Sequence, residues 1–179
     1  MIPFTEMDLP EVIRTIGYAG VFSIVFLESG IPFGFFLPGD SLLFTAGLLS
    51  ALNVFNLFLL IVLVIIAAIA GDSVGYWLGS KFGRHLFQKE DAIFLSKKNL
   101  ERTEAFYEKH GPKAIILARF VPVVRTFTPI LAGVAKMQYA TFIRYNIIGA
   151  VLWGAGVTTL GYFLGALIPD VDHYLLPII

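Results

Sequence analysis

The 179-residue sequence contains no cysteine, and few of its residues are charged. The absence of cysteine excludes disulfides, thiol nucleophiles and cysteine-ligated metals. Only 15% of the residues are Asp, Glu, Lys or Arg, whereas a typical soluble domain has about 25%. Hydrophobic residues make up 57% of the chain. A water-soluble fold could not bury so much apolar surface, so we expect lipid to cover much of it.

Several functional signatures are also missing. The sequence has no HExxH, P-loop or GxSxG motif, which argues against the common enzyme templates. Its three histidines stand in no metal-ligand spacing, and we predict no metal, no cofactor and no nucleic-acid partner. They are His85, His110 and His173. The first residues are acidic and lack the basic region of a signal peptide, so we expect the mature protein to keep its N-terminus.

Four apolar stretches are present, at about residues 12–52, 56–80, 114–135 and 139–168. The second and fourth are long enough to span a bilayer, which takes about 20 helical residues. The first and third contain prolines and ionised residues. Unpaired backbone groups in hydrocarbon cost several kcal/mol, so such breaks survive only where protein or water surrounds them. We predict an all-α membrane fold in which both broken stretches form re-entrant hairpins, the third with arms of about ten residues each. This would place the N-terminus on the outer side, but the alternative that the first stretch crosses the membrane is left open. The expected hairpin breaks are Pro32, Pro38, Gly39, Pro122 and Pro129.

The segment 81–113 is strongly basic, because it carries eight of the thirteen Lys and Arg residues. By the positive-inside rule this loop is predicted to be cytoplasmic. The two halves that it separates resemble each other at an offset of 86 residues. Ala46-Gly47 matches Ala132-Gly133, and the GYWLG run 75–79 matches the GYFLG run 161–165. We therefore predict a single domain, 1–179, built from inverted repeats at about 12–80 and 114–168, which is a recurring transporter plan.

Four charged residues lie inside the broken stretches. Glu28 and Asp40 belong to the first, Arg119 and Arg125 to the third. Charges within the membrane are costly, usually pair with one another and mark substrate or proton paths. If the hairpin tips meet, the acids and the arginines can form ion pairs near the midplane. A purely structural salt-bridge cluster is the alternative. Guanidinium groups bind phosphate bidentately, so the arginines suit an anionic head group, and the carboxylates could exchange protons.

Three further features lie on the spanning stretches. Asp72 is expected to belong to the proton path or to bond a neighbouring helix. Gly71, Gly75 and Gly79 form a small-xxx-small ridge, which predicts close helix packing. Trp153 is interpreted as a core-packing residue.

Several spaced motifs carry a resemblance to a known family. The first is FLESGIP at 26–32 followed by LPGDSLL at 37–43, and the second is ARFVPVVRTF at 118–127 followed by Ala132-Gly133. Gly71-Asp72, Asn146, Gly149-Ala150 and Trp153 agree as well. Over about residues 15–165 the chain resembles the DedA family, also called the VTT or SNARE-associated Golgi protein family.

The resemblance implies a multi-pass protein of the bacterial inner membrane with two opposed re-entrant hairpins. Bacterial members are implicated in recycling undecaprenyl phosphate and in proton-motive-force-dependent homeostasis, and eukaryotic relatives scramble phospholipids. The family's functional acids match Glu28 and Asp40, and its functional arginines match Arg119 and Arg125. Family members usually carry a further hydrophobic helix where this chain has only 166–179, so a missing C-terminal helix is left open.

The leading hypothesis is a proton-linked flippase for undecaprenyl phosphate or a related anionic lipid, with no enzymatic activity. Its partners would be that lipid and protons, and a homo-oligomer is left open. A passive phospholipid scramblase and a proton-coupled small-molecule or ion transporter are alternatives. An intramembrane aspartyl protease is a remote one, because Gly39-Asp40 and Gly71-Asp72 could supply a proton-sharing aspartate pair.

Overall fold

The computed structural model describes residues 9–31, 34–82 and 111–167. Every regular element in these ranges is helical. The helices are α1 (Leu9–Gly30), η1 (Gly34–Phe36), α2 (Gly39–Ala51), α3 (Leu57–Phe82), η3 (Gly111–Lys113), α5 (Ala114–Ala118), α6 (Pro122–Val134) and α7 (Tyr139–Leu167). The prediction of an all-α protein is confirmed for this part of the chain.

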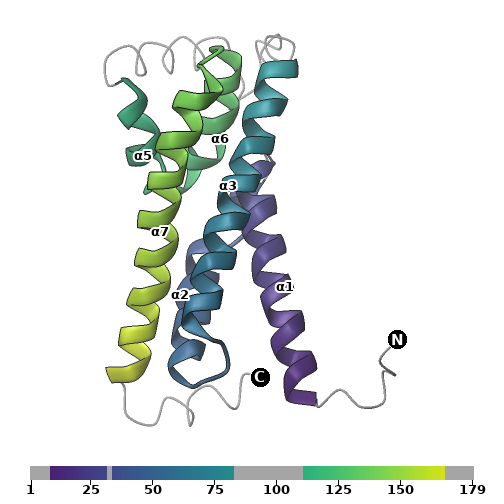
Figure 1. The fold of residues 1–179 in the computed structure, drawn as a ribbon, viewed down its shortest axis with the longest axis vertical. Helices are drawn as coiled ribbons and strands as arrows, with labels where there is room; N and C mark the ends of the chain where they lie inside the picture. Colours follow the sequence, from purple (N-terminus) through teal and green to yellow (C-terminus); the bar gives the residue numbers. More distant parts are fainter. Residues whose placement is uncertain (1–8, 32–33, 83–110, 168–179) are drawn as a thin grey trace.

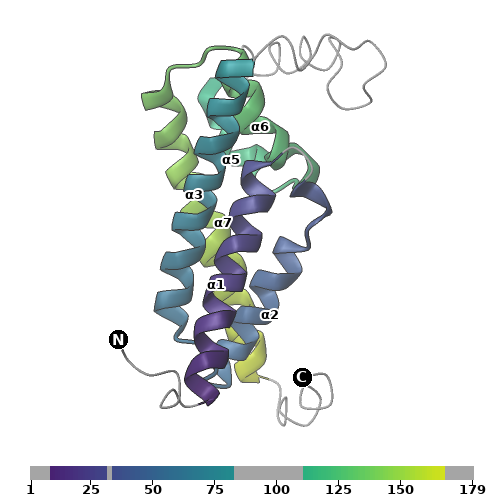
Figure 2. The ribbon, with the colours of Figure 1, turned by 90° about the vertical axis from the view of Figure 1, so that its right-hand side faces the viewer.

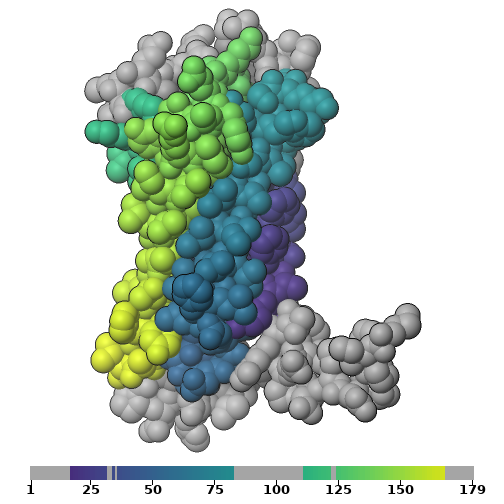
Figure 3. Space-filling view, in the orientation of Figure 1, coloured from purple at the N-terminus to yellow at the C-terminus, as the bar shows by residue number. Residues whose placement is uncertain are grey.

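Two long helices form the frame of the molecule. α3 has 26 residues and α7 has 29, which correspond to about 39 and 43 Å at about 1.5 Å per residue. Among the described residues, these two are the helices that are long and apolar enough to cross a membrane. They lie side by side along one face of the molecule (Figure 3). Large apolar side chains such as Phe58, Leu160 and Phe163 are exposed on them, as lipid contact requires.

The shorter helices form two pairs at opposite ends of this frame (Figures 1 and 2). In the orientation of Figure 1, α1 rises from the lower end to the middle, and α2 descends again. α5 descends from the upper end to the middle, and α6 rises again. With 13 residues each, α2 and α6 span about 20 Å, too little to cross a bilayer core of about 30 Å.

Close backbone contacts hold α2 against α7 and α6 against α3. A Cβ added to Gly47 would overlap the carbonyl oxygen of Thr158, and one added to Gly133 would overlap that of Tyr76. The predicted role of the glycine ridge on α3 is confirmed, because a Cβ on Gly71 would meet α1 and one on Gly79 would meet α6. Only glycine lets these helix axes approach so closely.

The chain breaks fall mostly where prolines and glycine were expected to produce them. Pro38 is the residue before α2 and Gly39 is its first residue. Pro122 is the first residue of α6, where a backbone N–H would have no partner within the helix, so proline costs no hydrogen bond there. Pro32 lies outside the described residues, as does most of the basic loop 81–113.

Two details of the third stretch differ from the prediction. Pro129 is not a break, because it lies inside α6, which continues through it to Val134. A helix can pass a proline at the expense of one hydrogen bond and a local kink. The arms are also unequal, since α5 has five residues and α6 has thirteen. The turn between them lies at 119–121, just ahead of Pro122.

Candidate functional site

The four helix ends at the middle of the molecule bring the charged residues together. Glu28 lies in the last turn of α1, and Asp40 lies in the first turn of α2. Arg119 directly follows α5, and Arg125 lies in the first turn of α6. An acid near the start of a helix is favoured by the helix dipole, whereas a cation there is disfavoured. Arg125 therefore depends on carboxylates from other helices.

Arg125 binds both acids of the first helix pair. Its Nη2 donates to Glu28 Oε1 and its Nη1 donates to Asp40 Oδ1 at 2.7 Å. Arg125 and Glu28 are buried, but the side chain of Asp40 is 44% exposed. This acid-rich cluster has two carboxylates for one guanidinium. When both acids are ionised it carries one excess negative charge, which a proton would neutralise.

Arg119 belongs to a second cluster with different partners. Its Nη1 donates to Asp72 Oδ2 on α3 and to Asn146 Oδ1 on α7. All three residues are buried, and Asn146 has no exposed surface. This balanced cluster has one carboxylate for one guanidinium. Such a pair leaves no net charge in the low-dielectric interior, where an unpaired charge would be very costly.

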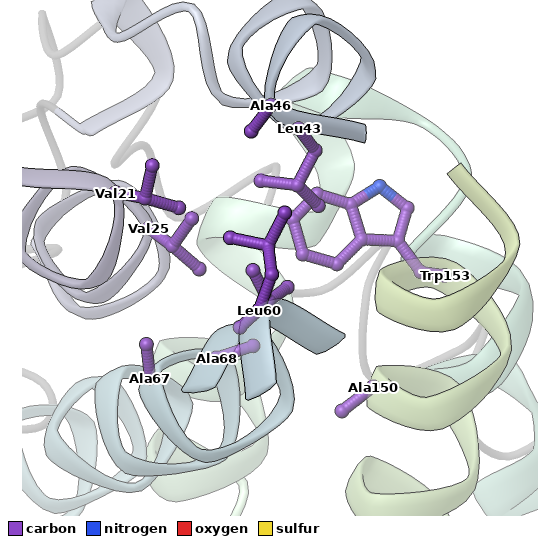
Figure 4. Close-up of a cluster of buried hydrophobic side chains, with 10 residues drawn as sticks. Val21, Val25, Leu43, Ala46, Leu60, Ala67, Ala68, Ala150 and Trp153 are labelled. Atoms are coloured by element: carbon purple, nitrogen blue, oxygen red, sulfur yellow. The ribbon is translucent and has the colours of Figure 1, made fainter. Parts of the chain in front are cut away.

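Trp153 of α7 lies between the two clusters. Its ring belongs to the largest apolar core, with Leu43, Leu60 and Ala150 (Figure 4). The indole Nε1 donates to Asp40 Oδ1 at 2.8 Å. The interpretation of Trp153 as a core residue is therefore correct but incomplete, because the same side chain is also a hydrogen-bond donor in the charged site.

The predicted charged residues all lie in this central region, but their pairing differs in one respect from the prediction. Glu28 and Asp40 bind only one of the two arginines through the hydrogen bonds above, and Arg119 binds Asp72 instead. The two aspartates are thus held by different guanidinium groups, which is unlike a proton-sharing aspartyl pair. Among the described residues, no three His, Asp or Glu side chains are grouped to hold a metal ion.

The sequence analysis named Asn146 and Trp153 among the residues of the family resemblance, but it gave Asn146 no role in the site and Trp153 only a packing role. Asn146 is a polar residue within a long apolar helix. A buried amide in such a helix needs a partner, so this position carried a usable signal. Nothing in the sequence indicated that the Trp153 N–H would face Asp40, since the two residues are 113 positions apart.

Comparison with known proteins assigns the chain to a family of membrane proteins. The VTT domain family matches residues 37–163. Protein DedA of Escherichia coli K12 is 46% identical over 175 residues, which cover 95% of this chain and 80% of that protein. The chain therefore belongs to the DedA family of VTT-domain membrane proteins.

Two other relatives extend this result. The uncharacterized membrane protein Rv0364 of Mycobacterium tuberculosis H37Rv is 48% identical over 149 residues, which cover 82% of this chain. This chain spans 65% of that protein's length. Inner membrane protein YqjA of Escherichia coli K12 is 36% identical over 162 residues, covering 90% of this chain and 73% of that protein. No solved structure matches. With these relatives, the chain is a bacterial membrane protein.

Proposed function

We propose that the protein is a proton-linked transporter that moves an anionic lipid across the bacterial inner membrane, with undecaprenyl phosphate or a related polyprenyl phosphate as the lipid. The observation that carries the proposal is the cluster of Arg125 with Glu28 and Asp40. A buried ion pair often stabilises a protein no more than an apolar replacement would. Stability alone is therefore a weak reason to keep three charges in an apolar interior.

Arg125 is the proposed phosphate-binding group. Guanidinium binds phosphate oxygens in the same fork geometry in which it binds carboxylates. In the resting state its donors are occupied by Glu28 and Asp40. Protonation of these acids would weaken their hold on Arg125, so that an anionic head group could replace them. The exposed part of Asp40 supports this order of events, because it gives protons and head groups access to an otherwise buried cluster.

In this scheme Arg119, which is less accessible than the cluster around Arg125, has a different role. It is buried, and its Nη1 donates to both Asp72 and Asn146, so that its own cluster has one carboxylate for one guanidinium and no exposed acid. We therefore assign initial head-group binding to Arg125, and we place Arg119 and Asp72 further along the lipid and proton path.

The proposed topology follows from the helix arrangement and the basic loop. α1–α2 and α5–α6 act as opposed re-entrant hairpins whose tips meet within the bilayer. The two halves act as an inverted repeat. This is supported by Gly47 and Gly133, which correspond at the offset of 86 and make equivalent close contacts with α7 and α3. With the loop 81–113 in the cytoplasm, the start of α1 and the end of α7 face the outside.

The decisive experiment measures transbilayer movement of undecaprenyl phosphate in proteoliposomes across a pH gradient. The variant Arg125→Ala removes the proposed binding group, and Arg144→Ala is the matched control, because Arg144 is exposed on α7. A hydrogen bond to a charged group contributes about 1.5–3 kcal/mol, so Arg125→Ala should slow movement by about ten- to a hundredfold. Arg144→Ala should behave as the wild type.

The same assay separates proton-linked transport from the alternatives. Movement in the wild type should depend on pH, and Glu28→Gln should abolish that dependence. Unchanged pH dependence in Glu28→Gln would contradict the coupling. Flat pH dependence in the wild type, with phospholipids moved as fast as the polyprenyl phosphate, would favour a passive scramblase. If no lipid moves, a proton-coupled small-molecule or ion transporter becomes the better hypothesis.

A further inference from the structure

The indole of Trp153 contacts both charged clusters. The guanidinium carbon Cζ of Arg125 lies 4.6 Å from the centroid of the Trp153 ring, and that of Arg119 lies 5.6 Å away. Both distances are within about 6 Å, where a cation is attracted to an aromatic ring. A single side chain of α7 thus contacts both arginines, although they are bonded to different acids.

The polar edge of the same ring reaches a third charged group. Trp153 Nε1 donates to Asp40 Oδ1 at 2.8 Å, and Arg125 Nη1 donates to that same oxygen at 2.7 Å. Two donors from two helices therefore converge on one carboxylate oxygen. They fix Asp40 against Arg125, although the side chain of Asp40 is 44% exposed.

We infer that Trp153 is a positioning residue: it holds Asp40 on Arg125, and through its ring it links the acid-rich cluster of Arg125 to the balanced cluster of Arg119. An anion that takes Arg125 displaces Asp40, and the indole then loses its hydrogen-bond acceptor. The ring must readjust, and Arg119 lies against it. Binding of an anion at the acid-rich cluster thereby changes the environment of Arg119 in the balanced cluster.

The geometric part of this inference is independent of transport, whereas its consequence for lipid binding rests on the proposed function. The first test therefore uses no lipid. The chain has only two tryptophans, and the other, Trp77, is half exposed and contacts Lys81 and Phe82. In a Trp77→Phe protein, all tryptophan fluorescence comes from Trp153.

In this single-tryptophan protein, Asp40→Asn and Asp72→Asn should each change the emission maximum or yield of Trp153. Asp72 makes no hydrogen bond to Trp153 in the described part of the chain, but it binds Arg119, which lies against the ring, so Asp72→Asn tests whether the ring senses the second cluster. Arg144→Gln, an exposed change on the same helix, is the control and should have no effect. An emission spectrum that Asp72→Asn leaves unchanged would overturn the link between the clusters. A spectrum insensitive to Asp40→Asn would overturn the positioning of Asp40.

The second test uses binding of farnesyl phosphate, with farnesol as the uncharged control, to protein in detergent. Trp153→Phe keeps an aromatic ring but removes the N–H, so Asp40 is held less firmly on Arg125. The half-saturating concentration of farnesyl phosphate should fall about tenfold or more, as expected for the loss of one hydrogen bond to a charged group that competes with the ligand. Equal affinity in Trp153→Phe and the wild type would mean that the N–H has no positioning role.

The two failures are distinguishable. If the wild type does not bind farnesyl phosphate at all, the proposed function fails, while the lipid-free emission of Trp153 still decides whether the indole links the clusters. If farnesyl phosphate binds but Asp40→Asn and Asp72→Asn leave the emission unchanged, the proposed function stands and the role of Trp153 is overturned.

Discussion

The carboxylate of Glu28 occupies the space beside Gly39 where any other residue would place its Cβ. An added Cβ at Gly39 would overlap Glu28 Oε2. Gly39 is the first residue of α2, and Glu28 is in the last turn of α1. Because position 39 has no side chain, the Glu28 carboxylate at the end of α1 can lie beside the start of α2 and bind Arg125.

We predict that Gly39→Ala weakens the pH dependence of transport about as strongly as Glu28→Gln, although it changes no charge. The methyl group would push the Glu28 carboxylate away from Arg125. Gly20→Ala is the control, because Gly20 lies in α1 with no neighbouring atom within 4 Å of an added Cβ. Lipid movement in proteoliposomes, at equal amounts of inserted protein, provides the measurement. Wild-type pH dependence in Gly39→Ala would show that Glu28 can keep its role from another position.

The buried pair of Arg119 and Asp72 should affect stability in a non-additive way. Asp72→Leu or Arg119→Leu alone leaves an uncompensated buried charge, which costs about 3–5 kcal/mol. The double variant removes both charges and should recover much of that loss. The unfolding temperatures of the two single variants and the double variant would be measured in detergent, with size-exclusion chromatography to monitor the folded fraction. Arg144→Leu would serve as the surface control. A double variant as unstable as the sum of the single ones would contradict direct pairing.

Gly47 and Gly133 should be equally intolerant of side chains. In each case an added Cβ overlaps a carbonyl oxygen of the facing long helix, so Gly47→Ala and Gly133→Ala should separate the packed helices. We expect each to lower the unfolding temperature by several degrees, which corresponds to about 1–3 kcal/mol of overpacking. Gly156→Ala has open space around its Cβ and should be neutral or slightly stabilising. A large effect at only one of the two positions would argue against equivalent repeats.

The proposed inverted topology can be tested with introduced cysteines, because the chain has none of its own. Asn53 follows α2 and Lys136 follows α6, and both are exposed, with φ angles of 61° and 53°. A membrane-impermeant maleimide should label Asn53→Cys in intact cells and Lys136→Cys only after lysis. Ala68→Cys, which is fully buried, should remain unlabelled throughout. Labelling of both loop positions from one side would contradict the inverted arrangement.

The positions of the chain breaks were largely predictable, and the exception has a physical reason. Pro38 and Pro122 stand beside helix starts, where the missing N–H of proline leaves no bond unmade. Pro129 has the same chemistry but lies eight residues into α6, packed against α3. Tertiary packing there maintains a helix that the local preference of proline would interrupt, and sequence alone does not reveal such packing.

The membrane character and the charged site were both visible in the sequence. Lipid imposes a free-energy cost on every unpaired charge and backbone group, so Glu28, Asp40, Asp72, Arg119 and Arg125 stood out in their apolar surroundings. The tertiary structure alone decided their pairing. Position along a helix sets the depth of a side chain, but the rotation and approach of neighbouring helices set which side chain it faces. The rotation and approach of the helices depend on contacts such as that of Gly71 with α1. This packing pairs Arg119 with Asp72, pairs Arg125 with both Glu28 and Asp40, and places Trp153 between the two clusters.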